Sequence, residues 1–135
     1  SYMKKALSIQ LGLLAVVIII GAIFKGNLGS DTLRALHKVV GMLAGLAAIA
    51  SVIVAFKAKA MPITKVLVLL AVLTTFMAGV AGKAAASGKG NYSTSFNRMR
   101  MFAVVSVAIT AGAYFTLDTA KHAAKKQVES EDKQD

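Results

Sequence analysis

The fold is decided by the stretch LHKVVGMLAGLAAIASVIVAF, which occupies residues Leu36–Phe56. Its polar side chains are His37 and Lys38 at its start and Ser51 further along. A helix needs about 20 apolar residues to cross a bilayer, because it rises about 1.5 Å per residue. The stretch has this length and no charge at its centre, so it predicts a membrane-spanning helix.

Three more stretches of the same kind lie at Leu7–Phe24, Ile63–Gly82 and Met101–Ala120. None has a charged residue near its centre, where an ionisable group costs several kcal/mol. The whole chain is 56% hydrophobic with a mean hydropathy of +0.66, values that are unusual for a soluble domain. We therefore expect an all-α integral membrane protein, a four-helix antiparallel bundle over residues 1–127 with a charged tail at 128–135.

The connections are expected at Lys25–Arg34, Lys57–Pro62 and Lys83–Arg100. The third is long and rich in Gly and Ser, which predicts a mobile loop. Lys121–Asp135 has a helix-forming composition and is expected to extend the fourth helix.

The net charge of +10 hides an uneven distribution, since four of the six acidic residues stand in the tail from Glu129 to Asp135. Basic residues at the ends of membrane helices reach toward anionic headgroups, so the predicted partner is a lipid bilayer with anionic headgroups. The basic residues are scattered over every loop without interleaved aromatics, a distribution that argues against a nucleic-acid partner. The chain has no cysteine, which excludes thiolate metal sites and disulfides.

The orientation is predicted as N-in and C-in in the cell membrane. Slightly more Lys and Arg residues fall on the side of the N-terminus than on the other side, in keeping with the positive-inside rule. The triplet Asn91-Tyr92-Ser93 is a glycosylation-type sequon that this topology puts outside.

The most informative candidate site begins at His37, which is followed at four and eight residues by Gly41 and Gly45. This spacing puts the three residues on one helix face. Histidine is the usual axial ligand of a b-type haem, glycines leave room for the macrocycle, and Arg34 and Lys38 are suitable partners for its propionates. The pattern predicts haem b with His37 on its iron; the alternative is an interfacial histidine bonded to water or headgroups.

A second axial ligand is left open among three choices. Met99 or Met101 starts the fourth apolar segment on the same side as His37. A second copy of the chain could instead bring another His37, or the iron could be five-coordinate. The other histidine, His122, belongs to the opposite side of the bilayer, where it shares a helix face with Asp118 as a proton-relay strip or a solvated helix end.

Small residues four apart predict close helix packing. Gly41 and Gly45 form such a pair, which Ala48 continues, and the later segments offer Ala78 with Gly82 and Ala108 with Gly112.

The run Arg34-Ala35-Leu36-His37-Lys38-Val39-Val40-Gly41, continuing to Gly45, resembles one four-helix half of the heme A synthase family, in particular its short archaeal members. The resemblance implies a four-span fold with haem near the outer end of the second helix. The family has a second histidine at the start of the fourth helix, and here Asn97–Met101 contains none. It also has an acidic residue where Arg34 stands, and many bacterial members carry a cysteine pair that is missing here.

The expected function is a haem-binding membrane protein, b-type cytochrome-like or a reduced heme A synthase relative, in or alongside a respiratory chain. The alternative is a non-catalytic accessory or assembly subunit of a larger membrane complex, and a third reading is a small transporter that uses Asp118. Either a homo-oligomer or a larger complex is expected, and the sequence leaves open whether the chain is an enzyme.

Overall fold

The computed structural model describes residues 2–25, 31–86 and 92–134, with side chains at 2–23, 31–85, 94–117 and 125–133. This part of the chain is helical and has no strand. Its elements are α1 (Tyr2–Lys25), α2 (Asp31–Lys57), α3 (Pro62–Ala86) and α4 (Tyr92–Gln134). The expected all-α membrane bundle is confirmed.

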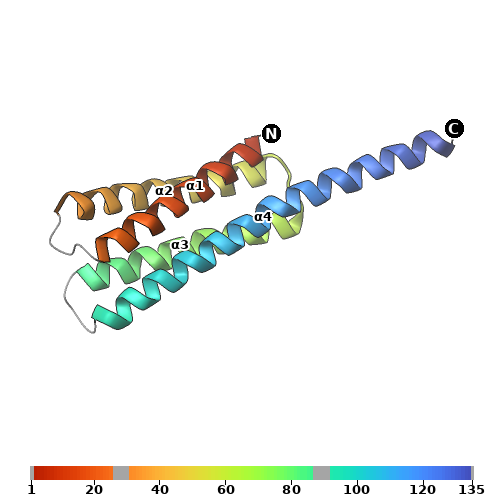
Figure 1. Ribbon diagram of the computed structural model, residues 1–135. Coiled ribbons are helices and arrows are strands. Elements are labelled where there is room, and N and C mark those ends of the chain that lie inside the picture. Colours follow the sequence, from red (N-terminus) through yellow and green to blue (C-terminus); the bar gives the residue numbers. More distant parts are fainter. Residues whose placement is uncertain (1, 26–30, 87–91, 135) are drawn as a thin grey trace.

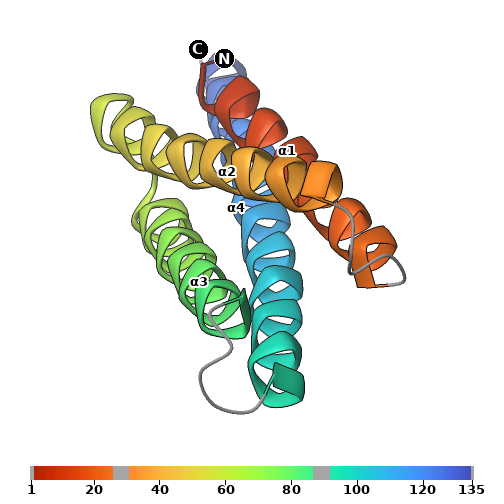
Figure 2. The same cartoon turned by 90° about the vertical axis from the view of Figure 1, so that its left-hand side faces the viewer.

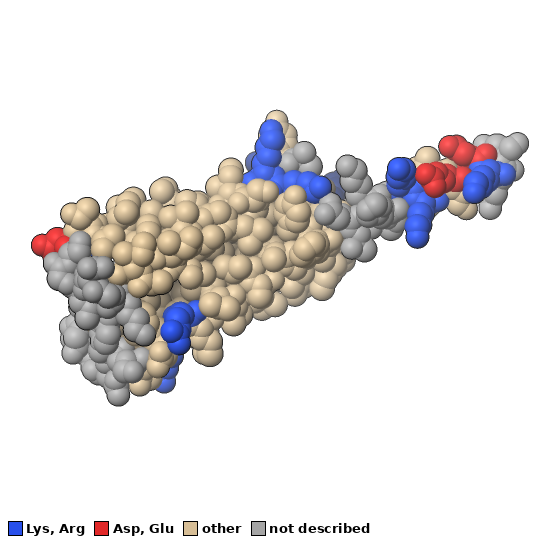
Figure 3. Space-filling view, viewed as in Figure 1, with Lys and Arg blue, Asp and Glu red and all other residues tan. Residues whose placement is uncertain are grey.

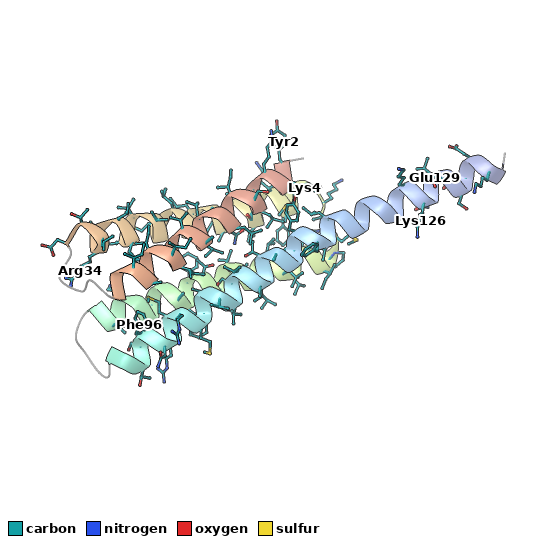
Figure 4. The ribbon with its side chains drawn as sticks, viewed as in Figure 1. Tyr2, Lys4, Arg34, Phe96, Lys126 and Glu129 are labelled. Atoms are coloured by element: carbon teal, nitrogen blue, oxygen red, sulfur yellow. The ribbon has the colours of Figure 1, made fainter. Side chains whose placement is uncertain are left out.

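The helices form two antiparallel pairs, α1 with α2 and α3 with α4, and α2 also packs on α3 while α1 packs on α4 (Figure 1). The first pair lies across the second as a separate layer (Figure 2). We call the end of the bundle where α1 and α3 begin the Tyr2 end and the end where α2 and α4 begin the His37 end. Figure 4 shows Tyr2 and Lys4 at the first of these ends and Arg34 and Phe96 at the second. Beyond the Tyr2 end, α4 projects alone out of the bundle (Figure 1).

The expected long loop at Lys83–Arg100 is wrong, because most of it is helical. Helix α3 continues to Ala86 through a run of alanines, the strongest helix formers. Helix α4 begins at Tyr92, and Phe96 in its second turn is buried. Tertiary packing of this turn adds the helical stability that its polar composition lacks.

The turn between α2 and α3 is tight and hydrogen-bonded. The amide of Ala60 donates to the carbonyl of Ala55 at 3.0 Å, and the amide of Lys59 donates to the carbonyl of Phe56 at 3.4 Å. This pair of bonds is the Schellman arrangement, which needs a left-handed residue after the helix. Lys59 supplies it with a φ of 53°. Pro62 then opens α3, where its missing N–H costs nothing.

The core runs as one inward-facing stripe on each helix, with buried residues alternately four and three apart. The central parts of these stripes are Met3, Leu7, Gln10 and Leu14 in α1; Ala44, Ala48, Ser51 and Ala55 in α2; Thr64, Val68 and Ala71 in α3; and Ser106, Thr110 and Ala113 in α4. This alternation is the heptad period of packed helix bundles. Most of these side chains are small, so the helix backbones approach closely.

The outside of the bundle is apolar. Each helix contains a segment long and apolar enough to cross a membrane, and only 22% to 28% of each spanning window is buried inside the protein. Large side chains such as Leu46, Leu73 and Val80 point outward with more than half of their surface exposed. A soluble protein rarely shows so much continuous apolar surface, whereas lipid tails solvate it. On the face in Figure 3 the charges stand near the ends and on the projecting helix, as a spanning bundle requires.

Candidate functional site

His37 lies on the inward stripe of α2, four residues before Gly41 and one heptad before Ala44. Its imidazole is half-buried against α1, where the backbone of Val17 forms a hydrogen bond with the side chain. A Cβ built on Gly21 would come within 3.3 Å of Cε1 of His37. The glycine on α1 therefore makes the notch that receives the ring, and α1 fixes the orientation of His37.

Gly41 and Gly45 do not act as a close-packing pair within the described chain. A Cβ built on either residue meets no atom within 4 Å, although Ala48, which continues the series, is fully buried. The expectation of tight packing at these two glycines is wrong here, because the buried stripe passes through Ala44 and Ala48. Open space consequently remains beside α2, one and two turns below His37.

Two basic residues stand near His37 in the sequence. Arg34 comes three residues before it and Lys38 one residue after it, and both side chains are exposed. Figure 4 places Arg34 near the start of α2. Long basic side chains at the end of a spanning helix can extend toward lipid headgroups while their stems cover apolar surface.

The methionines expected as second ligands lie on a different helix pair. Met99 packs on α3, because a Cβ built on Gly82 would meet Sδ of Met99 at 3.0 Å. Met101 is 55% exposed on the outside of α4. His37 packs against Gly21 of α1, whereas Met99 packs against Gly82 of α3. The two side chains therefore lie in different helix–helix interfaces.

A layer of buried polar residues crosses the middle of the bundle, and the hydropathy of the spans does not predict it. The amide Nε2 of Gln10 donates to Oγ1 of Thr110 at 3.4 Å, a contact that joins α1 to α4. Oγ of Ser106 donates to Oγ1 of Thr74 at 2.7 Å. Two further hydroxyls, Thr64 and Thr116, lie 2.6 Å apart nearer the Tyr2 end.

The buried polar atoms without a hydrogen-bond partner among the described residues include Oε1 of Gln10 and Oγ1 of Thr75. Gln10 has no exposed surface at all. An unsatisfied carbonyl oxygen at such a depth costs about 1–3 kcal/mol. A bound water molecule is the simplest partner for it.

The signal for this layer was present in the sequence. Gln10 stands three residues after Leu7 and four before Leu14, and Thr110 has the same relation to Ser106 and Ala113 in reverse order. Polar residues that fall on the four–three alternation of a spanning helix are expected to face the interior of the bundle, and Gln10 and Thr110 both do. Hydropathy alone ranks them as isolated polar residues within an apolar run.

The expectations for Asp118, for His122 and for the glycosylation-type sequon concern side chains that the structure does not describe. The side chains of Asp118 and His122, and with them the strip that these two form, are among the parts of α4 left without a side-chain description. The same holds for the sequon that begins at Asn91.

Comparison of the chain with models of protein families, with curated proteins and with solved structures found no match in any of the three.

Proposed function

We propose that the protein is a haem-binding integral membrane protein of the b-type cytochrome kind, acting in or alongside a respiratory chain, with His37 as an axial ligand. The observation that carries the proposal is the seat of His37. It is an inward-facing imidazole oriented by α1, with open space beside the glycines one and two turns below it.

The residues present fit one side of a haem. A ligating histidine is normally oriented through a hydrogen bond of its ring to a backbone or carboxylate group, and the backbone of Val17 is such a partner. Nδ1 of His37 lies 3.7 Å from a Cβ built on Gly21, so the ring must turn before this nitrogen faces the space beside Gly41 and Gly45. Gly41 and Gly45 leave space for a flat macrocycle, and the neighbouring side chains of α2 are apolar.

The second axial position is not formed by the described residues in their present arrangement. Met99 is engaged at Gly82, and Met101 faces outward. The site is therefore proposed as five-coordinate, as completed by a second copy of the chain, or as completed by Met99 after it leaves its notch. Haem supplies one-electron transfer when bound. The chain contributes the axial imidazole, an apolar wall that excludes water, and two cations near the membrane surface.

An absorption spectrum of the detergent-purified protein tests the proposal. We expect a Soret band that disappears in His37→Ala and persists in His122→Ala, which removes the chain's other histidine. Colourless protein from haem-replete cells, or a Soret band that survives His37→Ala, would overturn the assignment.

Gly41→Leu separates loss of haem from loss of fold. Open space surrounds this position, so a leucine side chain meets no described atom at its Cβ. We expect the variant to keep its helix content and thermal stability by circular dichroism while its Soret band falls. Gly79→Leu is the matched control, because Gly79 on α3 also has open space and is exposed. An unchanged Soret band in Gly41→Leu would show that haem does not occupy this space.

A second candidate function is supported by the same open space. A helix of another polypeptide is the usual occupant of a glycine pair spaced four apart in a membrane. On this proposal the chain is a non-catalytic accessory or assembly subunit that docks through Gly41 and Gly45. Stoichiometric co-purification with a larger partner, lost in Gly45→Leu, is the expected result. A colourless, stable homo-oligomer without partners would count against it.

A further inference from the structure

We propose that the groove between α1 and α2 at the Tyr2 end binds one anionic phospholipid. In this arrangement an acyl chain lies in the groove and the phosphate meets the ammonium groups of Lys5 and Lys57. The site is separate from His37, which belongs to the opposite end of the same helix pair.

The groove is a shallow, open depression of the surface with a volume of about 300 Å³. Its walls are apolar and low, since they consist of Ala6, Ile9, Ala47, Ala50 and Val54. Tyr2 and Lys5 complete the lining at the membrane end. The groove therefore has a wholly apolar body and a single polar mouth, the division found in a phospholipid.

Helical register adds a second cation at the mouth. Ala47, Ala50 and Val54 stand three and seven residues apart on one face of α2, and Lys57 continues that face one turn further. On α1 the positions of Tyr2, Lys5 and Ile9 share one face in the same way. Lys5 and Lys57 thus end the two walls of the groove, and both side chains are exposed.

The charges at this end favour an anion. Lys59 is exposed in the turn that follows α2. Lys5 lies over the ring of Tyr2, with Nζ 6.0 Å from the ring centroid, which holds its ammonium group close to the mouth. The acidic side chains that the structure describes stand elsewhere, at Asp31 and on the projecting part of α4. A phosphate here meets several cations without a described carboxylate to repel it.

The surroundings of the groove favour a lipid as its occupant. A narrow acyl chain can lie along its alanine floor. The groove also opens within the apolar spans, where lipid is the surrounding solvent.

The absence of tryptophan from the chain permits a direct test. In Ile9→Trp the new indole lines the groove as the only tryptophan, and in Ile19→Trp it stands on the same helix outside the groove. The two isoleucines are matched in exposure, at 60% and 58%. Each variant is reconstituted in phosphatidylcholine vesicles that contain a small fraction of brominated phosphatidylglycerol or brominated phosphatidylcholine, and quenching is measured.

We expect brominated phosphatidylglycerol to quench Ile9→Trp at about 25-fold lower mole fraction than brominated phosphatidylcholine, with no such preference for Ile19→Trp. Adding Lys5→Gln or Lys57→Gln should lower the preference about fivefold each, since one lysine near the surface contributes about that factor. Lys83→Gln, an exposed lysine at the His37 end, should leave it unchanged.

Three results would overturn the proposal. One is equal quenching by the two lipids at Ile9→Trp, and another is a preference that survives both lysine substitutions. The third is protection of Ile9→Trp from both lipids together with cross-linking of two chains, which would assign the groove to a second copy.

Discussion

At the scale of the residue, Gln10 is a buried side chain that the stability of the bundle does not explain. Its only hydrogen bond among the described residues is a long one to Thr110, and its carbonyl oxygen is buried without a partner. The hydroxyl of Thr110 already donates to the carbonyl of Ser106 at 2.6 Å. The hydroxyl of Thr110 therefore keeps a hydrogen-bond partner when Gln10 is replaced.

We predict that Gln10→Leu is neutral or stabilises the bundle by about 1 kcal/mol, because it removes an unsatisfied polar atom and keeps an apolar side chain of similar size. Thermal unfolding in detergent measures this change. The matched variant Thr64→Val breaks a 2.6 Å bond to Thr116 and should lower stability by about 0.6 kcal/mol. A loss of more than about 2 kcal/mol in Gln10→Leu would mean that a bound group completes the site of Gln10.

For the site at His37, the sequence predicts only those features that depend on the spacing of residues within one helix. The shared face of His37 and Gly41 follows from their spacing, and the inward stripe of α2 includes both. The notch that receives His37 comes from Gly21 on another helix, and no spacing within one segment reveals it. The expected close packing at Gly45 is wrong for the same reason, since packing depends on how close the neighbouring helix comes.

At the scale of the element, the helices follow from hydropathy and length, while their ends depend on local chemistry. The four spans are predictable because a bilayer demands about 20 apolar residues. The start of α4 is less so, because Phe96 and Met99 stabilise it through contacts with other parts of the bundle. Composition alone therefore assigned that segment to a loop.

The end of α2 offers a prediction at this scale. Lys59 adopts a left-handed backbone that costs a non-glycine residue about 1 kcal/mol. Lys59→Gly should therefore raise the free energy of unfolding by about 1 kcal/mol, measured by thermal or denaturant unfolding in detergent. The control Lys57→Gly lies within the last turn of α2 and should lower it by a similar amount. Destabilisation by Lys59→Gly would contradict the turn geometry.

At the scale of the whole molecule, the even number of spanning helices brings the start of α1 and the end of α4 to the same side (Figure 1). Which side this is remains the prediction of the positive-inside rule, N-in and C-in. Basic side chains stand at both ends of the bundle, Arg34 and Arg98 at one end and Lys5 and Lys57 at the other, so the described charges do not by themselves distinguish the two sides.

Single cysteines test this orientation cleanly, because the chain has none of its own. Thr32→Cys is exposed at the His37 end, and Lys133→Cys is exposed on the projecting part of α4. An impermeant maleimide applied to intact cells should label Thr32→Cys at once and Lys133→Cys only after the membrane is opened. The reverse pattern would place the His37 end inside.

The proposal of a haem at His37 is tested most directly by the haem content of the purified chain. The measurement is a pyridine haemochrome assay on detergent-purified protein from haem-replete cells, together with the mass of the protein–detergent particle. We expect roughly one b-type haem for every one or two chains, the lower value if two copies share an iron between their His37 residues. Purified protein that is folded, helical and free of haem would contradict the account.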